Sequence, residues 1–249
     1  MSALKEKTKM DFNLILQGKG GVGKSYSASL LAQYLLTKSQ PLISVDTDPN
    51  NSTLYSIKAL KAKFLTLFDE NERIDERNFD ALMELAMSNT DKNFIIDNGA
   101  TSFLPLIEYI KENDVFQMLS ENFNVYLHVP VTGGQAQDDT LNGLQQLINA
   151  YANNVKFIVW INEYYGKIQD TQNNTFENME VYTKNKKSIT AVLHLHAQNE
   201  KTFGRDIEEM TKAKLTFAEI NDHPNFALMT KQRLKIYQKD VFEQLALIF

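Results

Sequence analysis

The segment from Gly18 to Ser25 holds glycines and lysines at a spacing that suits phosphate binding. It reads GKGGVGKS and fits the pattern G-x-x-x-x-G-K-[ST]. Glycines let the backbone curl, so that successive N–H groups and a helix N-terminus point at the phosphates. We expect Lys24 to reach the β- and γ-phosphates and the Ser25 hydroxyl to bind magnesium. The residues predicted to contact the nucleotide are Gly18, Lys19, Gly20, Gly21, Val22, Gly23, Lys24, Ser25 and Tyr26.

Three carboxylates follow short apolar runs elsewhere in the chain. Asp46 and Asp48 lie in the segment DTDPN, and Asp97 ends the run FIID. Mg²⁺ keeps several waters and takes one or two carboxylates, so such acids suit a site beside a phosphate loop. On its own, the DTDPN segment is more typical of a turn before a helix, and a strand that ends in one acid is common. Beside the glycine loop, the functional interpretation is favoured.

The surrounding elements predict a parallel sheet. Strand-like apolar runs alternate with amphipathic helical patterns along the chain. The expected strands are 12–16, 42–46, 94–97, 125–131, 156–161 and 191–194, and the expected helices begin near 25, at 79 and near 141. Ligands of open α/β sheets gather outside the carboxyl ends of the strands, so the three acids are expected to meet the glycine loop. We expect a doubly wound, mostly parallel α/β sheet flanked by helices, in one domain over 1–249.

Composition excludes several classes of protein. The chain has no cysteine, which removes disulfides, thiolate catalysis and cysteine-bound clusters. Its net charge of −5 argues against a surface built wholly for DNA, although a local basic patch stays open. No run approaches the ~18 apolar residues of a membrane span. We expect a cytoplasmic protein.

Two further patterns admit a structural and a functional interpretation. His194 and His196 are one residue apart, but no third ligand has a recognisable spacing, so a structural role is favoured over metal binding. The segment 231–248 predicts an amphipathic helix with lysines on a second face. Such a helix can bind a membrane surface, yet packing of its apolar stripe on the sheet is favoured. Membrane binding is therefore not expected.

The second lysine of the glycine loop narrows the class of nucleotide-binding protein. Lys19 can hardly fold back onto its own phosphates, so it is better placed to serve a facing subunit. The loop resembles that of the deviant Walker A proteins, the MinD and ParA family, in which two subunits sandwich two ATP molecules. That resemblance implies that Lys19 acts in trans, much as an arginine finger does.

The same resemblance assigns roles to the acids. It implies that Asp48 orients the attacking water and that Asp46 holds magnesium through its water shell. Asp97 corresponds to the Walker B acid, so the predicted magnesium ligands are Ser25, Asp46 and Asp97. Gly99 departs from the family, which usually has proline there, and its amide is expected to sense the γ-phosphate.

The base is predicted to be adenine. Relatives that bind GTP carry N-K-x-D or T-K-x-D after a late strand, whereas this chain has Asn162-Glu163-Tyr164-Tyr165 and no aspartate at the required place. ATP is therefore preferred. Asn162 occupies the position where relatives use an asparagine to contact adenine, although an asparagine can also cap a turn.

Several stretches resemble a narrower family, the conjugal transfer TraL proteins of broad-host-range plasmids. The resemblance runs from about residue 12 to the C-terminus, and its form D-N-G-A accounts for Gly99. The stretches begin at Leu16, Ile96, Val131, Val159, Thr202 and Lys231. This resemblance implies an accessory ATPase of plasmid conjugation or maintenance.

These patterns together predict an ATPase that dimerises on ATP, hydrolyses it slowly with Mg²⁺ and switches its contact with a plasmid-transfer or partition protein. Three alternatives stay open. The first is a ParA-like partition protein that binds DNA nonspecifically when it holds ATP. The second is a small-molecule kinase that uses the same phosphate loop. The third is a binding module that responds to ATP without useful turnover.

Overall fold

A single seven-stranded sheet organises the chain. The structure, a computed structural model, describes residues 9–69, 75 and 77–249. Its strands are β1 (Met10–Ile15), β2 (Leu42–Asp46), β3 (Lys63–Phe64), β4 (Asn93–Asp97), β5 (Phe123–Thr132), β6 (Lys156–Asn162) and β7 (Ile189–Leu195). They lie in the order β3-β2-β4-β1-β5-β6-β7, and every pairing is parallel. The predicted fold class is confirmed, and each of the six expected strands is present.

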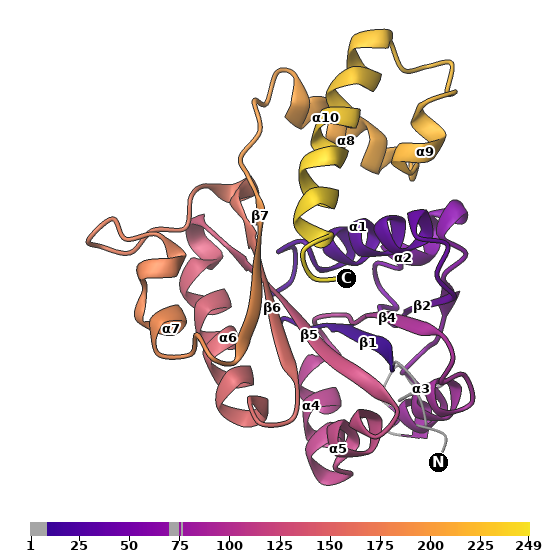
Figure 1. Ribbon diagram of the computed structural model, residues 1–249, viewed down its shortest axis with the longest axis vertical. Coiled ribbons are helices and arrows are strands. Elements are labelled where there is room, and N and C mark those ends of the chain that lie inside the picture. The colour runs from indigo at the N-terminus through magenta and orange to yellow at the C-terminus, as the bar shows by residue number, and fades with distance from the viewer. Residues whose placement is uncertain (1–8, 70–74, 76) are drawn as a thin grey trace, which may run out of the picture.

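Helices cover both faces of this sheet (Figure 1). They are α1 (Lys24–Thr37), α2 (Thr53–Ser56), α3 (Arg77–Met87), α4 (Phe103–Glu112), α5 (Val115–Ser120), α6 (Gln137–Tyr151), α7 (Glu180–Thr183), α8 (Phe203–Lys212), α9 (Phe217–Ile220) and α10 (Leu228–Leu245). Because successive residues of a strand face opposite sides, Phe94 and Ile96 of β4 pack with α3 to α6, whereas Ile95 packs with α1 and α10. The central strands are therefore buried on both faces, as a parallel sheet requires.

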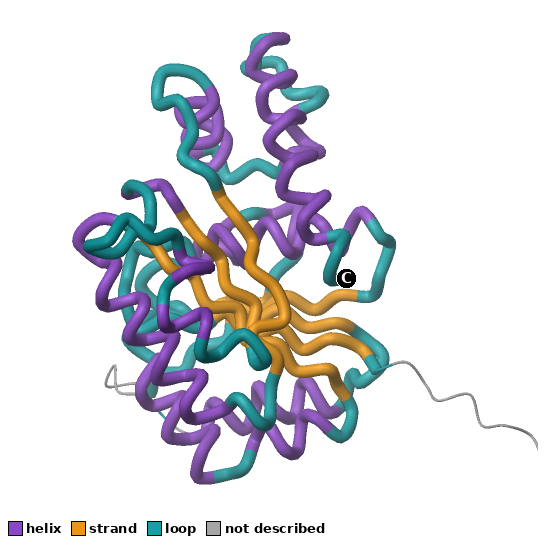
Figure 2. Tube along the Cα trace, turned by 60° about the vertical axis from the view of Figure 1, so that its left-hand side comes forward, coloured by secondary structure: helices purple, strands orange, loops and turns teal. Residues whose placement is uncertain are grey.

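The last helices form an extension beyond the carboxyl end of β7. α8 and α10 run side by side there, and the C-terminal end of α10 returns to α1 and the sheet (Figure 2). Asp206 of α8 is almost fully buried and forms an ion pair with Arg233 of α10. In the described parts of the chain, no helix combines the length and the apolar character that crossing a bilayer requires.

The C-terminal helix differs in extent from the predicted one at 231–248. It begins three residues earlier, at Leu228, and ends at Leu245. Its apolar stripe packs on the core through Leu234, Tyr237, Val241 and Leu245, as favoured. After the helix, Phe249 packs on the sheet, where its ring stacks on His128 at 6.2 Å between ring centres and meets Tyr126 edge-on at 5.4 Å.

His128 of β5 is a fully buried titratable group in the middle of the sheet. The Trp160 indole N–H donates to its Nδ1 at 3.0 Å, so its Nε2–H donates to Asn13 Oδ1, also at 3.0 Å. Both ring nitrogens are thus satisfied in the neutral form. Burial lowers the pKa of His128 to about 3.

We expect acid to destabilise the fold through His128. The unfolded histidine takes up a proton below its ordinary pKa of about 6.5, whereas the folded one stays neutral, so the unfolded state gains protons as the pH falls. Between pH 6.5 and 4.5 the free energy of unfolding should drop about 2 kcal/mol more in wild type than in His128→Asn. Urea unfolding of both proteins at several pH values measures this, and parallel pH profiles would contradict it.

Candidate nucleotide-binding site

The glycine loop joins the central strand β1 to the N-terminus of α1. Gly23 caps the helix with φ of 100°, a conformation that side chains rarely adopt. A Cβ there would also lie 2.7 Å from the Asn162 amide nitrogen. Glycine is therefore required at this position by backbone conformation and by space. The loop leaves the first turn of α1 open toward the carboxyl edge of the sheet.

Lys24 lies inside this loop rather than on the surface. Its ammonium donates to the Lys19 carbonyl at 2.9 Å, and the side chain is buried. Burial lowers the pKa of Lys24, and the nearby Asp97 and Asp48 oppose that shift. The Lys24 ammonium thus bonds to the main chain of its own loop. The sequence pattern predicts that phosphate oxygens would take this position.

Asn162, at the end of β6, fastens the loop from the other side. Its amide nitrogen donates to the Val22 carbonyl at 3.1 Å, and its side-chain oxygen accepts from the Tyr164 amide at 3.2 Å. Both atoms of the amide therefore bind within the protein. The structure places Asn162 beside the loop as expected, but as a residue that positions it, and its contact with adenine stays a prediction.

Tyr26 points away from the loop. Its hydroxyl donates to the Tyr237 hydroxyl of α10 at 3.0 Å, and the ring packs with the core between α1 and α10. Side-chain contact of Tyr26 with a nucleotide does not fit this orientation. Any contact of this residue with phosphate would be made by its main chain.

The acids meet the loop at the carboxyl edge of the sheet. Asp46 of β2 and Asp97 of β4 are register partners, and Asp97 is also the partner of Ile15 just before the loop. Asp46 accepts from the amides of Asp48 and Tyr55, each at 3.0 Å, and burial raises its pKa. The predicted convergence of strand ends is therefore present.

The Asp97 carboxylate is buried at the site and is available to bind a cation. Both carboxylate oxygens are buried and have no hydrogen-bond partner of good geometry among the described residues. Burial is the main cause that raises the pKa of Asp97 to about 7; Ser25 and Lys24 oppose this shift, and the other two acids add to it. Burial of a charged carboxylate costs free energy unless a cation or hydrogen-bond donor pairs with it. It fits Mg²⁺ held with its water shell beside the Ser25 hydroxyl.

The segments after β2 and β4 touch each other. Thr47 donates from its amide and its hydroxyl to the Asp97 carbonyl, at 3.0 and 3.1 Å. A Cβ on Gly99 would lie 3.0 Å from the Asp48 carboxyl carbon. The departure from proline at this position therefore leaves room for Asp48, and hydrogen bonds join the two acid-bearing segments.

Lys19 has a partner within its own chain. Its ammonium lies 2.7 Å from Asp139 Oδ2, and both side chains are about half exposed. Together with Phe103 they line an open hollow of about 390 Å³ in front of the loop. Asp139 and its neighbour Asp138 lie in the first turn of α6. No spacing rule would have linked Asp139 to Lys19, 120 residues earlier.

Two proteins named TraL from Escherichia coli are similar to this chain along nearly its whole length. Each is 42% identical over 234 residues, which is 94% of this chain and 96% of the relative. The chain belongs to the TraL family. No protein-family model matches it.

Solved structures similar to this TraL-family chain include MinD proteins. MinD from Aquifex aeolicus is 14% identical, with a TM-score of 0.48 over 92% of this chain and 95% of that one. MinD from Pyrococcus horikoshii OT3, complexed with Mg-ADP, is 15% identical, with a TM-score of 0.48 over 95% of this chain and 97% of that one. A proposed plasmid partition protein from Borrelia burgdorferi B31, bound to AMPPNP, is 17% identical, with a TM-score of 0.49 over 97% of this chain and 100% of that one. The P-loop fold of the TraL-family chain follows from its own strand order and glycine loop.

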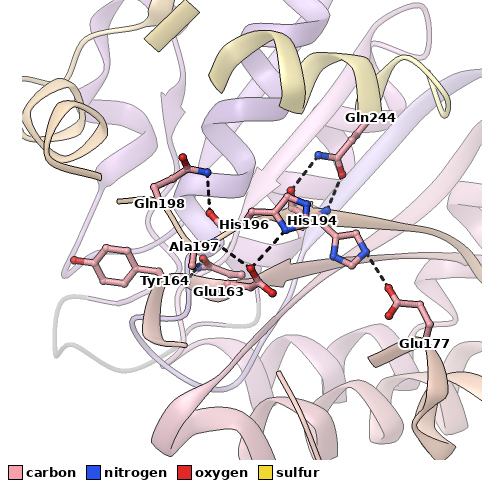
Figure 3. Close-up of polar contacts among 9 residues, drawn as sticks. Glu163, Tyr164, Glu177, His194, His196, Ala197, Gln198 and Gln244 are labelled. Carbon is pink, nitrogen blue, oxygen red and sulfur yellow. Dashed lines mark hydrogen bonds and ion pairs between the residues drawn. The ribbon is translucent and has the colours of Figure 1, made fainter. Parts of the chain in front are cut away.

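The two histidines of β7 and the loop after it have structural partners in this TraL-family chain (Figure 3). His194 lies 2.9 Å from Glu177, and His196 lies 3.5 Å from Glu163. The Gln244 side chain brackets the main chain of His194 by hydrogen bonds at 2.7 and 3.0 Å, so α10 covers part of the outer edge of β7. In the described ranges, no cluster of three or more histidine, aspartate or glutamate side chains could hold a metal ion.

Proposed function

We propose that this TraL-family chain is a magnesium-dependent ATPase that dimerises on ATP and acts as a switch in plasmid transfer. The observation that carries the proposal is the unpartnered Asp97 carboxylate, buried beside Lys24 and Ser25 where the glycine loop opens. The names of the relatives support the plasmid context. The proposal includes a single domain over 1–249, a cytoplasmic location and a plasmid-transfer or partition protein as partner.

In this proposal Lys24 exchanges a protein contact for phosphate contacts, and the unpartnered Asp97 gains a cation. Lys24 leaves the Lys19 carbonyl for the β- and γ-phosphates, and the loop amides from Gly18 to Ser25 take the remaining oxygens. Ser25, Asp46 and Asp97 hold Mg²⁺, in part through its waters. Bound Mg²⁺ neutralises charge that develops on the phosphates. Binding of this cation would offset the cost of burying the Asp97 carboxylate.

Asp48 is proposed to orient the attacking water. One of its carboxylate oxygens, Oδ1, is used within its own turn, where it accepts from the amides of Asn50 and Asn51 at 2.9 and 3.0 Å. Its Oδ2 faces Gly99 of the segment after β4. The turn thus fixes the carboxylate while leaving an oxygen at the edge of the site.

Lys19 is proposed to leave Asp139 and enter the site of a second subunit. The ion pair that holds it is exposed, and such pairs contribute only ~1 kcal/mol or less. The γ-phosphate of a facing subunit carries more charge and is closed off from solvent, so it competes well for the lysine. The hollow lined by Lys19, Phe103 and Asp139 leaves space for this approach.

Replacement of Asp48 by asparagine tests the hydrolytic step. Asparagine keeps the oxygen that caps the turn but has no negative charge, so ATP should still bind while phosphate release falls by about 10² or more. Phosphate release and ATP binding are measured on the same samples with Mg²⁺. Asp91→Asn, an exposed change of the same charge, is the control. Equal turnover of Asp48→Asn and wild type would contradict this role.

A further inference from the structure

A cationic aromatic surface lies on the segment that follows Asp48. We define it by Tyr55, Lys58, Lys61, Lys63 and Phe64, all of them exposed. The two rings are 42% and 41% exposed, and their centroids are 5.9 Å apart. The Lys58 ammonium lies 4.7 Å from the centre of the Tyr55 ring. Large aromatic side chains in this setting are unusual, because burial would remove their apolar area from water.

The charge of this surface opposes that of the whole chain. Its three lysines lie in a stretch, residues 49–68, that holds no aspartate or glutamate, although the chain has a net charge of −5. Lys58 begins a single 3-10 turn after α2 and Lys61 caps its end, whereas Lys63 precedes Phe64 in β3 and leaves the opposite side of this edge strand. Because β3 is an edge strand, this surface also lies at an open edge of the sheet. A polyanion fits it by charge.

The surface is bonded directly to an acid of the candidate site. The Tyr55 amide donates to Asp46 Oδ2 at 3.0 Å, and the Leu65 amide donates to the Asp46 carbonyl, also at 3.0 Å. Phe64 is the register partner of Asp46 across β2 and β3. Main-chain hydrogen bonds therefore join Asp46 to Tyr55 and to Leu65, the neighbour of Phe64.

We propose that the cationic aromatic surface binds single-stranded nucleic acid. Lysines that follow a phosphate backbone and aromatic rings that stack on bases are the two parts that such sites combine. A duplex keeps its base faces inside its own stack, so it would use the lysines but not the rings. An acidic peptide would likewise use the charge and leave the rings without a stacking partner. The exposed pair of rings favours the single strand.

Binding of a fluorescein-labelled 15-mer of deoxythymidine, followed by anisotropy on the full chain, tests this proposal. Phe64→Ala and Tyr55→Ala should each weaken binding about fivefold or more, since base stacking contributes that much. Phe64→Trp keeps a stacking face and should bind as well as wild type. Contacts from three lysines predict a slope of log K against log salt of about −2.

A triple lysine variant with a matched control locates the contact. Lys58, Lys61 and Lys63 changed to glutamate should weaken binding more than tenfold and flatten the salt dependence. The same change at Lys184, Lys186 and Lys187, which are exposed on another part of the chain, alters net charge equally and should have a much smaller effect. Equal loss in both triples would overturn the proposal, because binding would then follow net charge alone.

Competitors identify the class of ligand. An unlabelled single strand should displace the probe at lower concentration than a 15-base-pair duplex or polyglutamate of equal charge. Displacement by the duplex or by polyglutamate at the same concentration, or insensitivity to Phe64→Ala, would overturn the proposal.

Only the link to the nucleotide rests on the proposed function. If Mg-ATP alters the Asp46 segment, it should change the affinity for the 15-mer, and the 15-mer should change the affinity for ATP by the same factor. Because the 15-mer is first titrated without nucleotide, failure of ATP to bind would contradict the proposed ATPase and leave this surface standing. Intact ATP binding without any binding of the 15-mer would overturn the surface alone.

Discussion

Lys24→Ala should abolish nucleotide binding. The lysine is the only cation of the described residues that is buried within the glycine loop, and its alanine variant leaves the phosphates facing Asp97 and Asp48 without compensation. At a concentration of 100 Kd, ATP should stabilise the wild type against unfolding by about 2.7 kcal/mol and the variant by almost nothing. Thermal unfolding with and without Mg-ATP measures both values.

The control for Lys24→Ala is a lysine of the same chain with no place in the site. Lys111 is exposed near the end of α4, so Lys111→Ala removes the same charge and should keep the whole response to ATP. The unfolding temperatures without nucleotide show whether each variant is folded. Stabilisation of folded Lys24→Ala by ATP to the wild-type extent would remove the glycine loop from the proposed function.

Lys19→Ala should separate binding of ATP from its use. The Lys19 side chain lies outside its own loop, paired with Asp139, so its loss should leave ATP affinity nearly unchanged. Dimerisation on ATP should fail, and phosphate release should fall about 10³-fold, the scale of a charge supplied in trans to phosphoryl transfer. ATP titrations, phosphate release and light scattering on one preparation give the three quantities.

Asp139→Ala is the matched control for this variant. Both changes break the same ion pair, but only Lys19→Ala removes the cation proposed to act on a facing subunit. Asp139→Ala should therefore dimerise and hydrolyse ATP at least as well as wild type. Equal failure of the two variants would assign the defect to the ion pair, and unchanged turnover of Lys19→Ala would contradict the trans-acting lysine.

The residues of the site were predictable because their positions follow from a local pattern and a rule of topology. The spacing of Gly18, Gly23 and Lys24 is local, and the acids lie at the ends of apolar runs that could only be buried strands. A parallel sheet then brings Asp46 and Asp97 into register. Their chemical roles were not tested by this agreement and stay proposals.

What the sequence did not predict depends on contacts between distant residues. The strand β3 has two exposed residues and no apolar run, so it carries no pattern of its own. Beyond the end of α10, Phe249 packs on His128 of β5, which lies far earlier in the chain. Asp139 meets Lys19, and Asn162 meets Val22, only because β5 lies next to β1 in the sheet and β6 lies next to β5. None of these contacts has a spacing that could be found along the chain.

The molar mass of the wild type in solution tests the central proposal most directly. Light scattering is measured without nucleotide, with ADP and Mg²⁺, and with ATP and Mg²⁺ or a non-hydrolysable analogue. We expect the monomer mass of 28.5 kDa in the first two samples and twice that mass with ATP. A mass of 28.5 kDa in every sample, while ATP demonstrably binds, would contradict the dimerising switch.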